Sequence, residues 1–193
     1  MKRLSRIFRL VLVVFASIGS YPAVAQQIQE SAYQGMRWRM IGPTRGGRTR
    51  AACGVASEPN VFYMGAVNGG VWRSDDYGRT WNSIFDGQPT QSIGAIAVAP
   101  SDPNIIYVGS GEGLARPDLS LGNGVYKSTD AGKTWTHLGL RDSQGIPALA
   151  VDPRNPNRVF AAALGHPYGA SDERGIYYLL AFTNALMNEP RSD

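Results

Sequence analysis

The most constraining feature of this sequence is an eight-residue motif that occurs twice, at 74–81 (Ser-Asp-Asp-Tyr-Gly-Arg-Thr-Trp) and at 128–135 (Ser-Thr-Asp-Ala-Gly-Lys-Thr-Trp). We call each copy an octet. The five shared positions are Ser74, Asp76, Gly78, Thr80 and Trp81 in the first octet and Ser128, Asp130, Gly132, Thr134 and Trp135 in the second. A motif repeated at long range indicates a chain built from copies of one structural unit.

A second element occurs three times, as the dipeptides Pro59-Asn60, Pro103-Asn104 and Pro156-Asn157. Each copy leads to a short β-branched and aromatic segment that begins with glycine, at 70–73, 124–127 and 175–178. In the second unit we predict four strands, over 94–99, 105–109, 124–128 and 134–138. The Pro-Asn pairs are predicted to form the turn between the first two strands, and the octets the turn between the last two.

Four-stranded antiparallel units at a period of about 40–55 residues are typical of β-propeller blades. We therefore predict an all-β fold in which residues 37–178 form about two and three-quarter blades of an incomplete propeller. A closed ring takes about 4–8 blades. Segment 37–43 is predicted to supply an outer strand that would complete the last blade of such a ring. Open blades would expose strand edges that proteins usually cover. The chain is therefore expected to be either a truncated form of a longer protein, which we favour, or a short form that completes its blades between chains.

The octets have a mechanical explanation. Asp76 and Asp130 can accept backbone N–H bonds within the turn, and Gly78 and Gly132 can adopt positive φ without a Cβ clash. The tryptophan that ends each octet begins the outer strand and can wedge between blades. A Ca²⁺ loop needs more carboxylates than an octet offers, so we predict a structural turn with neither a metal nor a catalytic role.

The pattern Ser-x-Asp-x-Gly-x-Thr-Trp resembles the Asp-box of the bacterial neuraminidase (BNR) repeat. The wider pattern, over about 38–178, is similar to secreted bacterial repeat proteins related to the sortilin ectodomain, often labelled glycosyl hydrolase-like. This resemblance implies the propeller fold but does not select a chemistry, because Asp-box propellers include sialidases, xyloglucanases, sorting receptors and photosystem assembly factors.

Candidate binding residues lie in the connections that a propeller would place opposite the octets, where loops on a rigid scaffold collect. They are Arg45, Arg48, Asn68, Glu112, Arg116 and His166, accompanied by Asp118, Asp172 and Glu173. Convergent Arg and Glu side chains would suit a sugar, a carboxylate or a peptide. The structural alternative, which we favour, is that Arg45 or Arg48 pairs with Glu112 and pins neighbouring blades.

Two enzyme classes can be tested on this resemblance. The Arg-Ile-Pro signature that sialidases of this fold show near their start is missing. Xyloglucanases carry a catalytic Asp in a Thr-Asp-Ile-Gly-Gly-Ala-Tyr-Arg stretch, and segment 66–73 aligns Val67 with that Asp. Glycosidase chemistry needs two placed carboxylates. We therefore predict no catalytic residue and a non-catalytic module that binds a protein, peptide or glycan. The alternatives are a glycoside hydrolase fragment that lacks its catalytic carboxylates and a purely structural element.

Residues 1–25 have the order of a secretory signal peptide: a basic start, the apolar run 10–18, and Ala23-Val24-Ala25 before Gln26. We predict an exported protein, periplasmic or extracellular, with no membrane span after cleavage. Four of the 19 basic residues lie in this segment, which leaves 15 basic and 15 acidic residues and disfavours nucleic acid as a partner.

The remaining predictions concern the flanking segments and the single thiol. Residues 26–36 are predicted to be a linker. Residues 179–193 form an atypical, helix-like tail where a third octet is expected, which would fit a frameshift. Cys53 is predicted to be a buried small hydrophobe rather than a reactive thiol. No cofactor motif is found, so we predict no cofactor.

Overall fold

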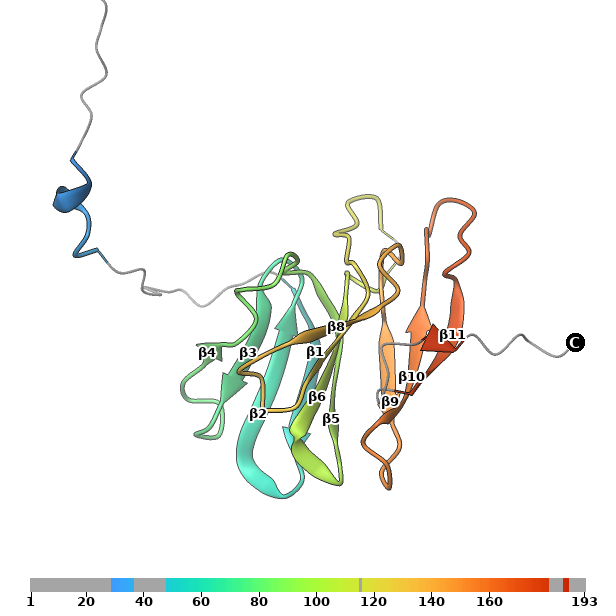
Figure 1. Ribbon diagram of the computed structural model, residues 1–193, viewed down its shortest axis with the longest axis horizontal. Coiled ribbons are helices and arrows are strands. Elements are labelled where there is room, and N and C mark those ends of the chain that lie inside the picture. Colours follow the sequence, from blue (N-terminus) through green and yellow to red (C-terminus); the bar gives the residue numbers. More distant parts are fainter. Residues whose placement is uncertain (1–28, 37–47, 115, 181–185, 188–193) are drawn as a thin grey trace, which may run out of the picture. The chain divides into compact units, whose positions relative to one another are not determined.

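The computed structural model describes residues 29–36, 48–114, 116–180 and 186–187 (Figure 1). The chain divides into two units, 1–42 and 43–193. In the first unit the described residues contain one 3₁₀ turn, Glu30–Ala32. The predicted signal peptide, the predicted outer strand 37–43 and Arg45 lie outside the described residues. Among the residues that are described, no helix is long and apolar enough to cross a membrane.

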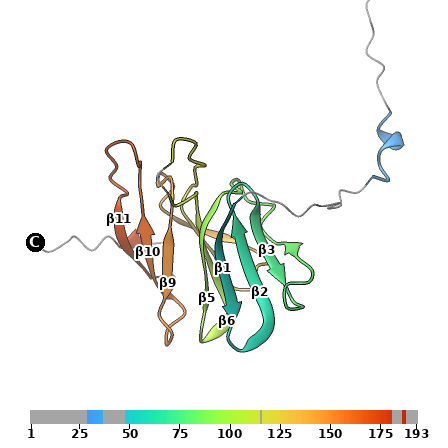
Figure 2. The same cartoon turned by 180° about the vertical axis from the view of Figure 1, so that it is seen from behind.

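The described part of the second unit consists of three four-stranded antiparallel sheets, each with its strands in consecutive order (Figures 1 and 2). We call them blades 1, 2 and 3. Blade 1 contains β1 (Thr49–Val55), β2 (Glu58–Ala66), β3 (Gly70–Ser74) and β4 (Asn82–Ser83). Blade 2 contains β5 (Ile93–Ala99), β6 (Asp102–Ser110), β7 (Val125–Ser128) and β8 (Thr136–Gly139). Blade 3 contains β9 (Ala148–Val151), β10 (Arg158–Ala163), β11 (Gly175–Leu180) and β12 (Leu186–Met187). The predicted all-β fold of incomplete propeller blades is confirmed.

The cores lie between the blades. Side chains alternate across each strand, so a blade presents one set of apolar residues to the preceding blade and another to the following one. Tyr63 and Val71 of blade 1 pack with Ile106 and Tyr126 of blade 2, in a cluster that continues through Phe85. A second cluster joins blades 2 and 3. Burying one such side chain stabilises the fold by about 1.5–3 kcal/mol.

The octet turns have the hydrogen bonds that their composition predicts, in the same arrangement in both copies. The Asp130 carboxylate accepts the Thr134 N–H at 2.8 Å and the Thr134 hydroxyl at 2.6 Å. The Ser128 hydroxyl accepts the Gly132 N–H at 2.8 Å and donates to Asp130. Gly132 has a φ of +92°, as predicted, and Ala131 before it also lies in the left-handed region. In the first octet Tyr77 takes that position.

The Pro-Asn pairs differ partly from their predicted place. In blades 1 and 2 the turn falls one step earlier, at 56–57 and 100–101, and Pro-Asn belongs to the beginning of β2 and β6. Only the third pair, Pro156-Asn157, lies in a turn. Proline has no N–H to donate, so the end of a strand tolerates it where the middle would not.

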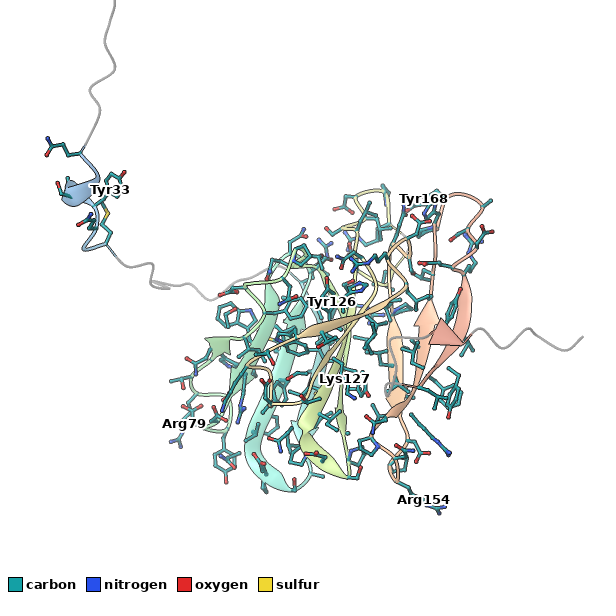
Figure 3. All side chains as sticks on the ribbon, viewed as in Figure 1. Tyr33, Arg79, Tyr126, Lys127, Arg154 and Tyr168 are labelled. Carbon is teal, nitrogen blue, oxygen red and sulfur yellow. The ribbon has the colours of Figure 1, made fainter. Side chains whose placement is uncertain are left out.

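In blades 1 and 2, the Asn of the pair joins the hairpin to the octet of the same blade. The Tyr77 N–H donates to the Asn60 carbonyl, and the Ala131 N–H donates to the Asn104 carbonyl, both at 3.0 Å. The hairpins and the octets therefore share one end of the blades, which we call the turn end. Figure 3 shows Arg79 and Arg154 at this end and Tyr168 at the other. The other end carries connections 67–69, 111–124, 140–147 and 164–174, and we call it the loop end.

Two further predictions can be compared with the structure. The tail is strand where it is described, because β11 continues to Leu180 and Leu186–Met187 pairs with it as β12. The helix-like composition is therefore misleading at these residues, where pairing to a neighbouring strand decides the structure.

Cys53 is partly buried against the core between blades 1 and 2. Burial raises the pKa of its thiol to about 11, which disfavours the reactive thiolate.

Candidate functional site

The loop end contains one deeply buried acid, Glu112, in the long connection between β6 and β7. Its side chain is 1% exposed. Its Oε1 accepts hydrogen bonds from the Arg48 guanidinium, with Nη2 at 2.6 Å and Nε at 3.1 Å. Arg116 approaches the same oxygen, with Nε at 3.4 Å. Arg48 precedes β1, so this group of charges joins blade 1 to blade 2. The Arg48–Glu112 pair, the structural alternative predicted from the sequence, is present.

A second contact beside this group also joins the two blades. The Asn68 amide, in the tight connection between β2 and β3, donates to the Ser120 hydroxyl at 2.7 Å. The Ser120 backbone in turn holds Glu112, because the Glu112 N–H donates to the Ser120 carbonyl at 3.0 Å. Ser120 was not singled out in the sequence, since its role depends on the path of a long loop.

Close backbone approach explains why glycines frame Glu112. Gly111 has a φ of +86°, and a Cβ there would lie 2.2 Å from the Gln144 carbonyl oxygen. The Gly111 N–H donates to the Ser92 carbonyl at 2.8 Å, and the Ile146 N–H donates to the Ser110 carbonyl at 2.9 Å. Only glycine allows this packing, which fixes the backbone from which Glu112 projects.

Blade 3 contributes a loop to the same end. The Tyr168 hydroxyl donates to the Arg116 carbonyl, while the Tyr168 residue as a whole stays 68% exposed. Tyr168 was also missed in the sequence, although an aromatic residue between Pro167 and Gly169 in a long connection is a recognisable signal. His166 does not join the Arg48–Glu112 group through a direct contact; its Nε2 pairs with Asp142 at 3.0 Å.

The other acids of the loop end are placed differently. Asp118 is exposed and pairs with Arg116, whose Nε lies 3.2 Å from Oδ1. That hydrogen bond and the Arg116 charge hold the pKa of Asp118 below its usual value. Asp172 offers its backbone carbonyl to the Tyr177 hydroxyl. Within the described residues, no group of three or more His, Cys, Asp or Glu side chains could hold a metal ion.

Val67 is buried next to Arg48, to which its backbone is hydrogen-bonded. Its N–H donates to the Arg48 carbonyl at 2.9 Å, and its side chain is 2% exposed. The resemblance described in the sequence analysis aligns this residue with a catalytic Asp of xyloglucanases. The aligned position therefore lies at the loop end, beside the candidate residues, and carries an apolar side chain that cannot transfer a proton.

The loop end thus combines half-exposed guanidinium groups, an exposed carboxylate, amide and hydroxyl groups, and an exposed aromatic ring. Such a set can hydrogen-bond and stack against a polar ligand. Glu112 Oε1, which accepts hydrogen bonds from Arg48 and forms an ion pair with Arg116, holds the loops together. Arg48 and Arg116 still have guanidinium surface open to solvent, with side chains 47% and 37% exposed.

Sequence comparison relates the chain to a group of glycan-degrading enzymes. It is 31% identical over 122 residues to an oligoxyloglucan-reducing end-specific xyloglucanase of Emericella nidulans, covering 61% of this chain. It is 31% identical over 100 residues to a probable enzyme of the same name from Neosartorya fischeri, covering 50%. It is 30% identical over 119 residues to the xyloglucanase Xgh74A of Acetivibrio thermocellus, covering 58%. These matches span only 14%, 11% and 13% of the relatives' own lengths. No protein-family profile matches the chain.

Structural comparison agrees on the fold. An ancestral GH74 enzyme superposes with a TM-score of 0.61 at 21% identity, over 78% of this chain and 19% of that one. The GH74 enzyme of Niastella koreensis superposes with a TM-score of 0.51 at 25% identity, over 68% and 20%. The chain is therefore similar to β-propeller glycoside hydrolases. This finding favours the glycoside hydrolase alternative over the non-catalytic binding module that the sequence analysis preferred.

Proposed function

We propose that this chain is part of a xyloglucanase-type β-propeller and that its loop end binds a β-glucan of the xyloglucan class. The observation that carries the proposal is the 30–31% identity to three xyloglucanases over 100–122 residues. The charged and aromatic groups of the loop end support it, because they offer the contacts that a sugar chain uses. Hydrolysis by a longer protein, with carboxylates supplied by other blades, is part of the same proposal.

Three groups are proposed to touch the glycan. The Tyr168 ring, 68% exposed, offers an apolar face on which a sugar ring can stack. Arg116 offers guanidinium N–H donors, and Asp118 offers an acceptor for sugar hydroxyls. Tyr168 and Arg116 are already joined by a hydrogen bond between the two loops, so binding would require little reorganisation. Arg48 and Glu112 would act behind these groups by fixing the loop that carries Arg116.

The described blades are proposed to contribute binding and not proton transfer. Hydrolysis of a glycosidic bond generally uses two carboxyl groups on either side of that bond. Val67 removes one candidate, and Glu112 is buried and bound to two arginines. The 193-residue chain should therefore bind an oligoxyloglucan without cleaving it.

Two finer assignments belong to the same proposal. The hydrogen bonds of both octets support membership of the wider Asp-box group, to which the BNR and sortilin-like repeats belong. The basic start, apolar run and Ala-x-Ala site of residues 1–25 support export, as an enzyme acting on an insoluble or high-molecular-weight polysaccharide would require.

Isothermal titration of the chain with an oligoxyloglucan tests the proposal. We expect saturable binding that Tyr168→Ala and Arg116→Ala each weaken about tenfold, equivalent to about 1.4 kcal/mol. An unbranched cello-oligosaccharide and a sialoside serve as ligand controls. Arg154→Ala serves as the protein control, because Arg154 is at the turn end (Figure 3).

Two results would count against the proposal. If the folded chain shows no saturable binding of an oligoxyloglucan, its loop end is not a glycan site of this class. If the chain releases reducing sugar from xyloglucan, proton transfer occurs within these blades, and the role given to Val67 is wrong.

A further inference from the structure

The connection 164–174, between β10 and β11, contains a tight turn that carries the Tyr168 ring. This connection projects beyond the ends of the two strands (Figure 1). The Gly169 N–H donates to the His166 carbonyl at 3.2 Å and so closes a four-residue turn. Pro167 is its second residue and Gly169 its fourth, the positions that these two residue types favour in a β-turn. Tyr168 is therefore presented at the tip of the loop.

A single side chain, Arg174, donates to both ends of this turn. Arg174 directly precedes β11, and its Nη2 donates to the carbonyls of His166 and Gly169, the latter at 2.9 Å. Its Nε donates to the Leu164 carbonyl, just after β10, at 3.1 Å. A guanidinium presents its N–H groups in a rigid planar fork, so these bonds fix the three carbonyls relative to one another. We call Arg174 and its three carbonyls the arginine clamp.

The arginine clamp is internal to one loop. Every side-chain hydrogen bond of Arg174 to the described residues goes to a carbonyl of connection 164–174. None of the ion pairs among the described residues includes Arg174. The guanidinium is therefore used to hold backbone, and this use depends on no neighbouring blade.

The base of the same connection is fixed without Arg174. The Leu164 N–H donates to the Gly145 carbonyl at 2.9 Å, and the Gly165 N–H donates to the Ser143 hydroxyl at 3.2 Å. Both bonds attach the base to the link between blades 2 and 3. Removing the guanidinium should therefore loosen the tip of the loop while its base stays in place.

We propose that Arg174 is a positioning residue for glycan binding, which holds the 166–169 turn so that the Tyr168 ring is already oriented for a sugar. This inference rests on the proposed function, in which that ring stacks on an oligoxyloglucan. A ring on a loose turn would have to be ordered on binding, and that ordering lowers affinity. The Tyr168 hydroxyl, bonded to the Arg116 carbonyl, ties the ring to blade 2, and the arginine clamp ties its backbone to blade 3.

Calorimetric titration with an oligoxyloglucan tests the effect on binding. Arg174→Ala should weaken binding about fivefold, because the ligand must then order the turn. Arg174→Lys keeps the charge but loses the planar fork, so it should weaken binding by a similar factor. In a Tyr168→Ala background, Arg174→Ala should have no further effect, since Arg174 acts only through that ring. Arg154→Ala, the loss of an arginine at the turn end, is the control and should leave binding unchanged (Figure 3).

Amide hydrogen exchange of the chain without ligand, followed by NMR, tests the positioning itself. In Arg174→Ala and Arg174→Lys the Gly169 N–H should exchange about tenfold faster, because the turn that it closes opens more often. The Leu164 and Gly165 N–H groups at the base should exchange as in the unmodified chain. A role of Arg174 in general stability would instead speed exchange at all three groups.

The two measurements separate the failure of this inference from that of the proposed function. No binding by the unmodified chain overturns the proposed function, and with it the glycan role of Arg174, even where exchange at Gly169 responds. Binding together with unchanged Gly169 exchange in Arg174→Ala overturns this inference alone. So does an Arg174→Lys variant that binds like the unmodified chain, or an Arg174→Ala effect that persists without the Tyr168 ring. Weaker binding with faster exchange confined to the tip supports it.

Discussion

Arg48 and Glu112, 64 residues apart in the sequence, join two blades at a distance of 2.6 Å between Nη2 and Oε1. The carboxylate is buried, while nearly half of the arginine side chain faces solvent. The difference in burial gives the two side chains different roles at the loop end. Glu112 holds the loops in place, and the arginines that hold it still present N–H groups to the outside.

Glu112→Gln should destabilise the fold by about 1–3 kcal/mol, because the loop loses its charged acceptor while both arginines remain. Urea unfolding measures this as a lower midpoint with an unchanged slope. Asp118→Asn, at the exposed partner of Arg116, should change the free energy of unfolding by less than about 0.5 kcal/mol. Equal effects of the two substitutions would contradict the structural role given to Glu112.

Gly78 and Gly132 form a matched pair for measuring the contact between blades. Both have positive φ, but a Cβ on Gly132 would meet Ile84 at 2.5 Å, whereas one on Gly78 would meet Trp81 at 3.5 Å. Each change to alanine should cost about 1–2 kcal/mol for the backbone, and Gly132→Ala about 1 kcal/mol more for overpacking. Urea unfolding of the two single variants measures both costs. Equal costs would mean that Ile84 moves aside freely.

The octet aspartates predict how stability changes with acid pH. Hydrogen bonds from the Thr80 and Thr134 hydroxyls and N–H groups lower the pKa of Asp76 and Asp130 to about 2. Because the folded pKa lies below the unfolded value, the contribution is complete above about pH 5 and is lost as the pH falls toward 2.

Thermal unfolding between about pH 2 and pH 6 checks this linkage. The midpoint of the unmodified chain should fall with acid more steeply than that of the Asp76→Asn, Asp130→Asn double variant. The gap between the two should be widest near pH 6 and should shrink toward pH 2. Parallel curves would show that these carboxylates do not contribute through their ionised form.

The leader prediction has a direct chemical readout. On expression in a bacterium with a secretory pathway, the exported chain should begin at Gln26. Signal peptidase recognises the small residues Ala23 and Ala25 and cuts once, after Ala25. Mass spectrometry of the exported protein identifies that end. Ala25→Arg should block the cut and leave the precursor at the membrane, whereas an exported chain that still begins at Met1 would refute the assignment.

The fold could be predicted in detail because the repeat constrains it. Two octets and three Pro-Asn pairs in register specify four-stranded units, and the predicted strands of blade 2 differ from β5–β8 by three residues or fewer at each end. In blades 1 and 2 the predicted turn was placed too late in the sequence, at the Pro-Asn pair instead of just before it. A proline at the start of a strand and a proline in a turn look alike in the sequence. At 179–180 and 186–187, the described part of the tail, composition was misleading because β12 forms by pairing with β11.

The site was harder to predict, because it depends on how long loops fold back. The Arg48–Glu112 pair could be proposed from the topology alone. Ser120 could not, because it holds Glu112 through backbone contacts within a connection of more than ten residues. Tyr168 has a recognisable sequence context, but its contact with the Arg116 carbonyl depends on how two long loops meet. His166 was grouped with the other candidates by its loop, yet its partner Asp142 comes from the link between blades 2 and 3.

The central claim is that the loop end recognises xyloglucan-class glycans. The most direct test is calorimetric titration of an oligoxyloglucan into the chain and into its Tyr168→Ala, Arg116→Ala double variant. We expect saturable binding that the double variant weakens at least about tenfold, with both proteins folded. Binding that the double variant leaves unchanged, or no binding by the unmodified chain, would contradict it.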